Sequence, residues 1–184
     1  MRTFVAIPLS AECRNALSDV QGTLRKFGSD VRWTALPSIH ITLKFLGEIS
    51  PTLLPALSDA LRASAVPARF GLCLEGLGAF PDLARPRVIW CGLGGDLEIL
   101  SALQAEVEAA CVKTGFPSED RPFKAHLTLG RVQGRTNLQP LVDYIRIAAS
   151  PRCEFAVEGY HIYKSTLTPK GAIYEILETI HLGL

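Results

Sequence analysis

The sequence of 184 residues lacks several features that assign a chain to a class at once. No stretch of about eighteen apolar residues occurs, so no membrane-spanning helix is expected. The apolar run near the N-terminus, FVAIPL, is too short for the hydrophobic segment of a secretory signal peptide. The net charge is only +1, which excludes a protein that coats nucleic acid along its length. A local cluster of cations could still bind a ligand with one or a few phosphates.

The cysteines are odd in number and widely spaced. No C-x-x-C pair occurs among the five, which are Cys13, Cys73, Cys91, Cys111 and Cys153. A zinc site or a disulfide framework is therefore not expected, and buried free thiols in a reducing compartment are the prediction. With no leader and no membrane span, the sequence predicts a soluble cytoplasmic protein, and we expect a monomer.

Apolar residues make up 48% of the chain, enough for one sizeable core or for two small lobes that share one. β-Formers, helix caps and hydrophobic periodicity predict the elements. Strands are expected at residues 3–7, 39–46, 70–80, 86–93, 125–132, 154–165 and 172–180, with a short extended segment at 31–36. Helices are expected after Ser10 up to Gly28, after Ser50 and Pro51, after Asp96 up to Gly115, and over 138–149 with Pro140 in its first turn. The segment TLTPKG, residues 166–171, is expected to turn.

Two segments repeat a strand, a turn and a helix in the same order. They are HITLKFLGEISPTLLPALSDAL, from residue 40, and HLTLGRVQGRTNLQPLVDYI, from residue 126. We therefore predict one α+β domain over residues 1–184, formed by an internal duplication, with motifs at 40–43 and 126–129. It has two pseudo-symmetric lobes, each with an antiparallel sheet and helices on its outer face. The helix-free faces then enclose a central active-site cleft.

Each repeated segment opens with His, an aliphatic residue, Thr and Leu. The chain has only four histidines and eleven threonines, so two such matches arise by chance with a probability of roughly 2%. Residues i and i+2 of a strand point to the same side, so His40 shares a face with Thr42, and His126 with Thr128. A lone copy of this pattern is usually structural, but a doubled copy in matched context favours a site.

Two imidazoles and two hydroxyls around one small volume suit cleavage of a phosphodiester. One histidine can accept a proton from the nucleophile while the other protonates the departing oxygen. The rival hypothesis is a metal site, which usually needs three protein ligands, often with carboxylates. Neither motif has Asp or Glu in the next four residues, so we expect no metal and no cofactor. His161 and His181 lack the Thr partner and are expected to be structural or surface residues.

The chain resembles the two-histidine phosphoesterases, and among them the RNA 2′,3′-cyclic phosphodiesterases once described as 2′-5′ RNA ligases. The resemblance rests on MRTFVAIPL, VRWTALPSIHITLKFLGEI, PRVIWCGL, RPFKAHLTLGR and YKSTLTPKGAIYE, and spans nearly the whole chain. It implies a bilobal α+β fold and metal-independent hydrolysis of RNA 2′,3′-cyclic phosphate ends, or of small cyclic-phosphate nucleotides, to a 2′-phosphate. It also implies that His40 is the proton donor and His126 the proton acceptor.

The hydroxyls of Thr42 and Thr128 can donate hydrogen bonds to the non-bridging oxygens of a phosphate. The resemblance implies that Arg131 also contacts the phosphate. On a regular strand Arg131 faces away from His126, because five is an odd offset, but Gly130 would permit a bulge that turns it back. Lys44 has the right parity to reach the edge of the cleft.

Other hypotheses about the function stay open. The same pocket could perform 2′-5′ ligation or cleavage, or hydrolyse a small cyclic phosphate, and a non-catalytic module could bind RNA ends. The aromatic residues Trp33, Phe45, Trp90 and Tyr163 could stack on bases, but each is expected to be a core residue instead.

Overall fold

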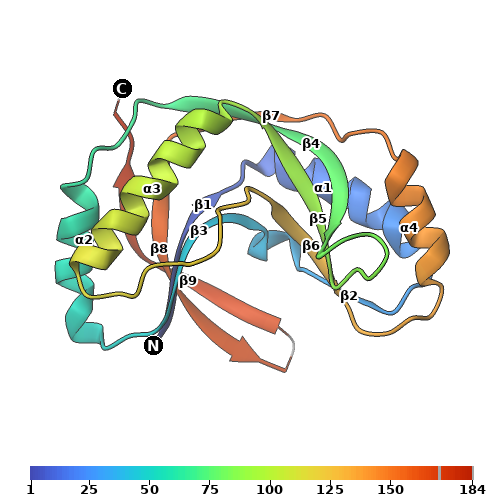
Figure 1. Ribbon diagram of the computed structural model, residues 1–184, viewed down its shortest axis with the longest axis horizontal. Coiled ribbons are helices and arrows are strands. Elements are labelled where there is room, and N and C mark those ends of the chain that lie inside the picture. The colour runs from blue at the N-terminus through green and yellow to red at the C-terminus, as the bar shows by residue number, and fades with distance from the viewer. Residues whose placement is uncertain (170, 184) are drawn as a thin grey trace.

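The computed structural model describes residues 1–169 and 171–183, which form an α+β fold (Figure 1). In chain order the elements are β1 (Arg2–Pro8), α1 (Ala11–Arg25), β2 (Val31–Trp33), η1 (Leu36–Ser38), β3 (His40–Glu48), η2 (Pro51–Leu53), α2 (Leu54–Arg62), β4 (Phe70–Phe80), β5 (Val88–Gly95), α3 (Leu97–Lys113), β6 (Leu127–Val132), α4 (Leu138–Ile147), β7 (Glu154–Val157), β8 (Gly159–Thr168) and β9 (Gly171–His181). β8 runs to Thr168 and β9 begins at Gly171, so residues 166–168 and 171 of the predicted turn segment belong to strands. Lys170 lies outside the described residues.

The helix starts follow local capping chemistry. The Ser10 hydroxyl accepts a hydrogen bond from the Cys13 amide at the start of α1, and Pro140 lies in the first turn of α4, as predicted. Asp96 precedes α3 but does not cap it with its side chain. Its carboxylate instead accepts a hydrogen bond from the Gly71 amide of β4, 2.9 Å away, and so joins the start of the helix to the sheet.

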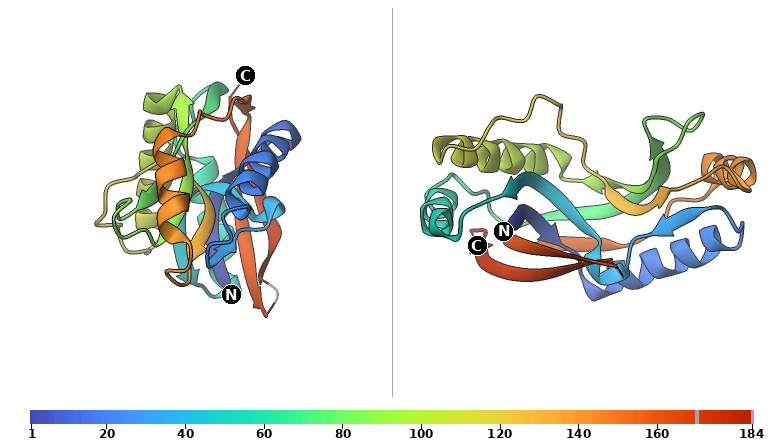
Figure 2. Two further views of the ribbon diagram at one scale, coloured as in Figure 1. Left: turned by 90° about the vertical axis from the view of Figure 1, so that its right-hand side faces the viewer. Right: turned by 90° about the horizontal axis from the view of Figure 1, so that it is seen from below.

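Two antiparallel sheets form the frame, in the orders β3-β1-β8-β9 and β2-β6-β5-β4-β7. Apart from β2, the second sheet repeats the order of the first, because β6, β5, β4 and β7 take the places of β3, β1, β8 and β9. Helices α2 and α3 lie on the side of the first sheet, and α1 and α4 on the side of the second (Figures 1 and 2). The prediction of two similar α+β lobes is confirmed.

The lobes do not coincide with the two halves of the chain. Helix α1, from the first half, packs on the second sheet, where the Gln21 side chain donates to the Leu129 carbonyl at 2.8 Å. Helix α3, from the second half, packs on β3, where Gln104 donates to the Leu43 carbonyl at 3.3 Å. Each motif strand is therefore covered by a helix from the other half of the chain, and each lobe contains segments of both halves.

The segment predicted as one strand over residues 154–165 is in fact two strands in different sheets. β7 pairs with β4 in the second sheet, and β8 pairs with β1 in the first. The chain crosses between them at Gly159, where a Cβ would lie 2.5 Å from the Ile180 carbonyl oxygen. Only glycine fits so close to another backbone. The change of sheet was not predicted, because Gly159 lies within a continuous run of apolar and β-favouring residues.

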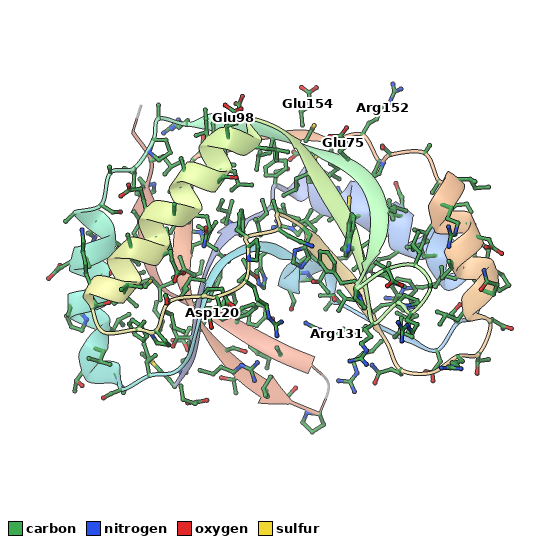
Figure 3. All side chains as sticks on the ribbon, in the orientation of Figure 1. Glu75, Glu98, Asp120, Arg131, Arg152 and Glu154 are labelled. Carbon is green, nitrogen blue, oxygen red and sulfur yellow. A yellow bond between two sulfur atoms is a disulfide. The ribbon has the colours of Figure 1, made fainter. Side chains whose placement is uncertain are left out.

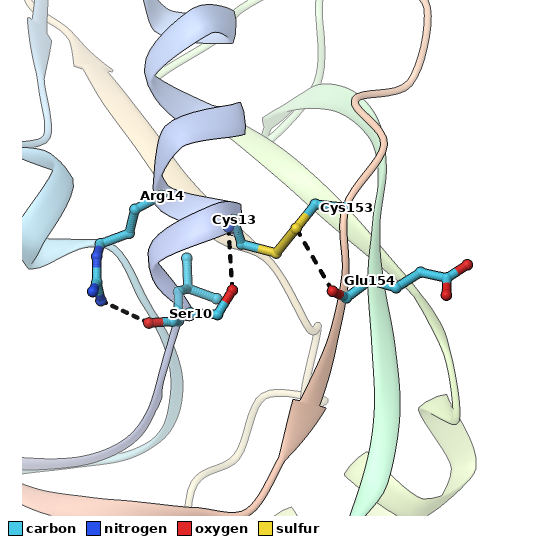
Figure 4. The surroundings of a disulfide bond; sticks show 6 residues. Ser10, Cys13, Arg14, Cys153 and Glu154 are labelled. Atoms are coloured by element: carbon cyan, nitrogen blue, oxygen red, sulfur yellow. Dashed lines mark hydrogen bonds between the residues drawn. A yellow bond between two sulfur atoms is a disulfide. The ribbon is translucent and has the colours of Figure 1, made fainter.

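The prediction that all five cysteines are free is wrong for two of them. Cys13, in the first turn of α1, forms a disulfide with Cys153, which precedes β7, and their Cα atoms lie 5.6 Å apart (Figure 4). The two residues are 140 positions apart in sequence, so their spacing carried no sign of the pairing. Cys73, Cys91 and Cys111 are free. In the described part of the chain, no helix combines the length and the apolar character needed to cross a bilayer.

Candidate active site

The two His-x-Thr pairs lie on the helix-free faces of the two sheets. His40 begins β3 opposite Pro8, and Thr42 lies opposite Ala6. His126 immediately precedes β6, where Thr128 lies opposite Trp90 of β5. The alternating residues Ile41 and Leu127 point to the helix-covered side and are fully buried, as the period-two pattern predicts. The sequence motif therefore places both polar pairs on faces that no helix covers.

Both motif strands contain a bulge one residue after the threonine. On β3 the register skips Leu43, since Lys44 pairs with Val5 and Thr42 pairs with Ala6. On β6 it skips Leu129, since Gly130 pairs with Ile89 and Thr128 with Trp90. An extra residue reverses the parity of everything that follows it in the strand.

The bulge brings Arg131 to the face of Thr128. Arg131 pairs with Val88, and Val88 shares a face with Trp90 because the two are neighbours on alternate positions of β5. The bulge anticipated at Gly130 is present one residue earlier, and the parity objection to Arg131 does not hold. In the first motif the corresponding position is Phe45, which shares a face with Thr42 and is 64% exposed.

The same parity change turns Lys44 away from the site, so the expectation that it reaches the cleft edge is wrong. Lys44 is only 6% exposed, and its ammonium donates to Glu108 Oε1 of α3 and to the Pro117 carbonyl, both at 2.8 Å. Glu108 Oε1 also accepts from the Glu119 amide at 2.8 Å. Pro117 and Glu119 belong to the loop that leads to His126. The buried Lys44–Glu108 ion pair therefore fixes this loop, which connects α3 to the second motif.

The two imidazoles are oriented by the same hydrogen bond. His40 Nδ1 lies 2.9 Å from the Ser38 carbonyl oxygen, and His126 Nδ1 lies 2.7 Å from the Lys124 carbonyl oxygen, in each case two residues earlier. A carbonyl oxygen only accepts, so each Nδ1 carries the proton. In the neutral form Nε2 then keeps its lone pair, and Nε2 is the atom through which each ring can exchange a proton.

His40 is enclosed by aromatic rings. The Phe4 ring stacks on it at 4.7 Å between centroids, and the Tyr174 ring meets it edge-on at 5.4 Å, with Tyr163 next at 6.3 Å. This burial is the main cause that lowers the pKa of His40 to about 4. The hydrogen bond to Ser38 raises the pKa and so opposes the effect of burial, whereas the charge of His126 lowers the pKa further. His40 is therefore neutral at pH 7 in the ligand-free protein, and the two histidines are close enough to interact electrostatically.

His126 has a different surrounding. Phe80 meets its ring edge-on at 4.9 Å, and the Lys124 ammonium lies over the Phe80 ring, 5.7 Å from its centroid. Among the described residues, His126 thus has one aromatic neighbour where His40 has three. The two histidines make the same kind of Nδ1 hydrogen bond but differ in how completely each imidazole is shielded from water.

Arginines border both faces. Burial raises the pKa of Tyr174, and the charges of Arg2 and Arg131 oppose that rise, so both guanidiniums lie within electrostatic reach of Tyr174. Figure 3 labels Arg131. Arg32 of β2 pairs directly with Arg131 and shares its face. No salt bridge involves these three arginines within the described residues. Sequence reasoning missed Arg32, because only the pairing of β2 with β6 reveals which way it points.

The other two histidines are not part of this pair of motifs. His161 Nδ1 lies 2.9 Å from the Thr179 hydroxyl, so its threonine partner comes from the neighbouring strand β9. In residues 1–169 and 171–183 no group of three or more His, Cys, Asp or Glu side chains could hold a metal ion. A hollow of about 710 Å³ lies beside β4, β5 and β7, lined by Arg69, Asp96 and Glu154 among others, and neither motif histidine borders it.

Known proteins match this chain along most of its length. The model of the 2′-5′ RNA ligase superfamily matches residues 9–168. The RNA 2′,3′-cyclic phosphodiesterase of Aeropyrum pernix is 35% identical over 164 residues, which cover 85% of this chain and 93% of that protein. A crystal structure of a Thermus thermophilus protein superposes with a TM-score of 0.82 at 30% identity, over 99% of this chain and 98% of the other. E. coli LigT in complex with 3′-AMP superposes with a TM-score of 0.80 at 26% identity, over 98% and 97%.

Proposed function

Because this chain belongs to the 2′-5′ RNA ligase superfamily, we propose that it hydrolyses RNA 2′,3′-cyclic phosphate ends to 2′-phosphates. The observation that carries the proposal is the pair of imidazoles, one from each sheet, with matched Nδ1 hydrogen bonds and an available Nε2. The relatives named RNA 2′,3′-cyclic phosphodiesterase, at 31–36% identity, support the substrate class.

In the proposed reaction His126 is the proton acceptor and His40 the proton donor. Nε2 of His126 takes a proton from water as the water oxygen bonds to phosphorus, and the bond from phosphorus to O3′ breaks on the opposite side. Nε2–H of His40 gives its proton to O3′, and the phosphate remains on O2′. Thr42, Thr128 and Arg131 bind the non-bridging oxygens, since hydroxyls and a guanidinium donate to the charge that these oxygens carry.

The donor role requires that the substrate change the protonation of His40. Its pKa of about 4 must rise by roughly 3 for the imidazolium to predominate at pH 7, which corresponds to about 4 kcal/mol. A phosphodiester anion within hydrogen-bonding distance favours the charged imidazole, and the faces of the Phe4 and Tyr163 rings also attract a cation. Substrate binding and charging of His40 are therefore coupled.

The decisive experiment is the identity of the product. An RNA oligonucleotide with a 2′,3′-cyclic phosphate end should yield only the 2′-phosphate, detected by phosphorus NMR or by chromatography against both monoester standards. A 3′-phosphate or an even mixture would mean that a different ring oxygen faces His40, and would refute the assignment of donor and acceptor.

Catalysis in this proposal needs no metal, since the imidazoles transfer the protons and Arg131 with the threonines offsets the phosphate charge. Turnover should therefore survive exhaustive treatment with a chelator. Activity that is abolished by the chelator and restored by a divalent cation would instead support a metal site.

The family description favours one second candidate, 2′-5′ ligation. If a 5′-hydroxyl replaces water beside His126, attack at phosphorus with departure of O3′ produces a 2′-5′ phosphodiester by the same proton transfers. Incubation of a cyclic-phosphate end with a 5′-hydroxyl RNA separates the two reactions, because ligation lengthens the labelled strand. A module that only binds RNA ends would turn over neither substrate.

A further inference from the structure

The helix-free face of the first sheet continues beyond the motif as an exposed apolar surface. Strand register puts Phe45, Phe4, Tyr163 and Ile176 in one row across β3, β1, β8 and β9. Phe4 is buried within the row, whereas Phe45 is 64% and Ile176 53% exposed. We call the residues of this face that a ligand can reach the apolar platform: Phe45, Tyr163, Tyr174, Ile176 and Leu167.

The platform extends along the β8–β9 hairpin, away from the body of the protein. Tyr174 pairs with Ser165, and Leu167 with Ala172, on the same face as Tyr163 and Ile176. β1 pairs with β8 only from Thr3 to Ala6, so this part of the hairpin projects past the sheet (Figure 1). Leu167 is 65% exposed. A contiguous exposed apolar surface of this kind marks a binding site more often than isolated exposed residues do.

We propose that the apolar platform binds the bases of the nucleotides that precede the cyclic phosphate, an inference that rests on the proposed function. The platform adjoins the catalytic residue directly, because the Tyr174 ring contacts the His40 ring at 5.4 Å between centroids. An RNA end held at His40 must place its preceding nucleotides on one of the neighbouring surfaces. Bases stack on aromatic and apolar side chains with little dependence on sequence.

Positive charge around the platform, from both sheets, favours RNA over a protein partner or a second copy of the chain. Arg2 and Arg131 both act on Tyr174, and Arg32 stands beside Arg131. Within the described residues none of these guanidiniums is paired with a carboxylate, so they remain available to phosphates between successive bases. The nearby Lys164–Glu175 ion pair lies on the opposite face of the hairpin and adds no negative charge to the platform.

The test compares two isoleucines of the same strand. Ile176 faces the platform, whereas Ile173, which pairs with Thr166, faces the other way and is similarly exposed at 62%. The measured quantity is kcat/KM for a five-nucleotide RNA with a 2′,3′-cyclic phosphate end, divided by kcat/KM for adenosine 2′,3′-cyclic phosphate. In the wild-type protein the oligonucleotide should be favoured at least about fivefold, the lower end of what one stacked base contributes.

Ile176→Glu should lower this ratio severalfold, because it puts a carboxylate among the bases and phosphates. Ile173→Glu adds the same charge to the other face and should leave the ratio unchanged. A wild-type ratio near one, or equal effects of both substitutions, would overturn the proposal. So would a dimer that Ile176→Glu dissociates in light scattering, because the platform would then bind a second copy. Failure to turn over either substrate would instead refute the proposed function.

Discussion

The aromatic enclosure of His40 predicts how the pKa of this residue responds when one ring is removed. A pKa of about 4, against an ordinary value near 6.5, means that the fold favours the neutral imidazole by roughly 3 kcal/mol. The main cause is loss of water around the ring, so readmitting water should reverse much of the effect. Tyr174 is the suitable position, because it contacts His40 edge-on from the edge strand β9 and is only half-buried.

Tyr174→Ala should raise the pKa of His40 to about 5, since Phe4 and Tyr163 still shield the other sides of the ring. Tyr174→Phe keeps the ring and should leave the pKa near 4. NMR titration of the histidine Cε1–H resonances from pH 3.5 to 8 measures the change, and His40→Ala identifies the resonance by its absence. A wild-type pKa near 6.5, or equal values in the wild type and Tyr174→Ala, would refute the argument from burial.

Stability should follow the same shift, with a defined sign. The folded-state pKa of His40 lies below the unfolded value, so the unfolded chain binds more protons between about pH 6.5 and 4. The stability that this group contributes is complete above pH 6.5 and declines as the pH falls through that window, by roughly 3 kcal/mol in total. Urea denaturation should show a smaller decline over the same window in Tyr174→Ala. An equally steep decline would assign the acid sensitivity to other groups.

Three further predictions concern the motifs and their support. His40→Ala and His126→Ala should each lower turnover about 10²–10⁴-fold without unfolding the protein, and the double variant should be little worse; near-normal turnover by either single variant would exclude the two-histidine mechanism. Arg131→Ala should cost roughly 10–150-fold, and Arg131→Lys should not restore a bidentate contact; a silent Arg131→Ala would remove this residue from the site. Lys44→Met should lower the free energy of unfolding by about 3–5 kcal/mol in urea titrations, because it leaves the Glu108 carboxylate buried without its partner. Lys164→Met breaks an exposed pair and should lower the free energy of unfolding by less than about 1 kcal/mol. Similar losses in the two variants would contradict the role of burial.

Local patterns were sufficient to predict most elements and to place the two His-x-Thr pairs on strands. Strands with alternating apolar residues and helices with Ser caps form where expected, since these signals act over a few residues and do not depend on distant partners. The doubled His-x-Thr pattern also pointed to His40, Thr42, His126 and Thr128, because period-two geometry puts residues i and i+2 of any strand on one side. The roles of the two histidines came only from family resemblance, and they remain proposals.

Tertiary structure decided what depends on register and on pairing between distant segments. The bulges at Leu43 and Leu129 reverse strand parity. As a result Lys44 points to the buried side of its sheet, whereas Phe45 and Arg131 point to the helix-free faces that carry the His-x-Thr pairs. A bulge is a property of two paired strands, so one strand read alone cannot reveal it. The same holds for Arg32, whose direction follows from β2 pairing with β6.

Burial and long-range contact set the remaining features. The aromatic rings around His40 come from β1, β8 and β9, and so its low pKa arises from segments up to 134 residues away in sequence. The Cys13–Cys153 disulfide and the change of sheet at Gly159 likewise depend on which segments meet in space. Side-chain chemistry and strand period are local properties of the chain, whereas solvation, register and pairing exist only once distant strands have come together.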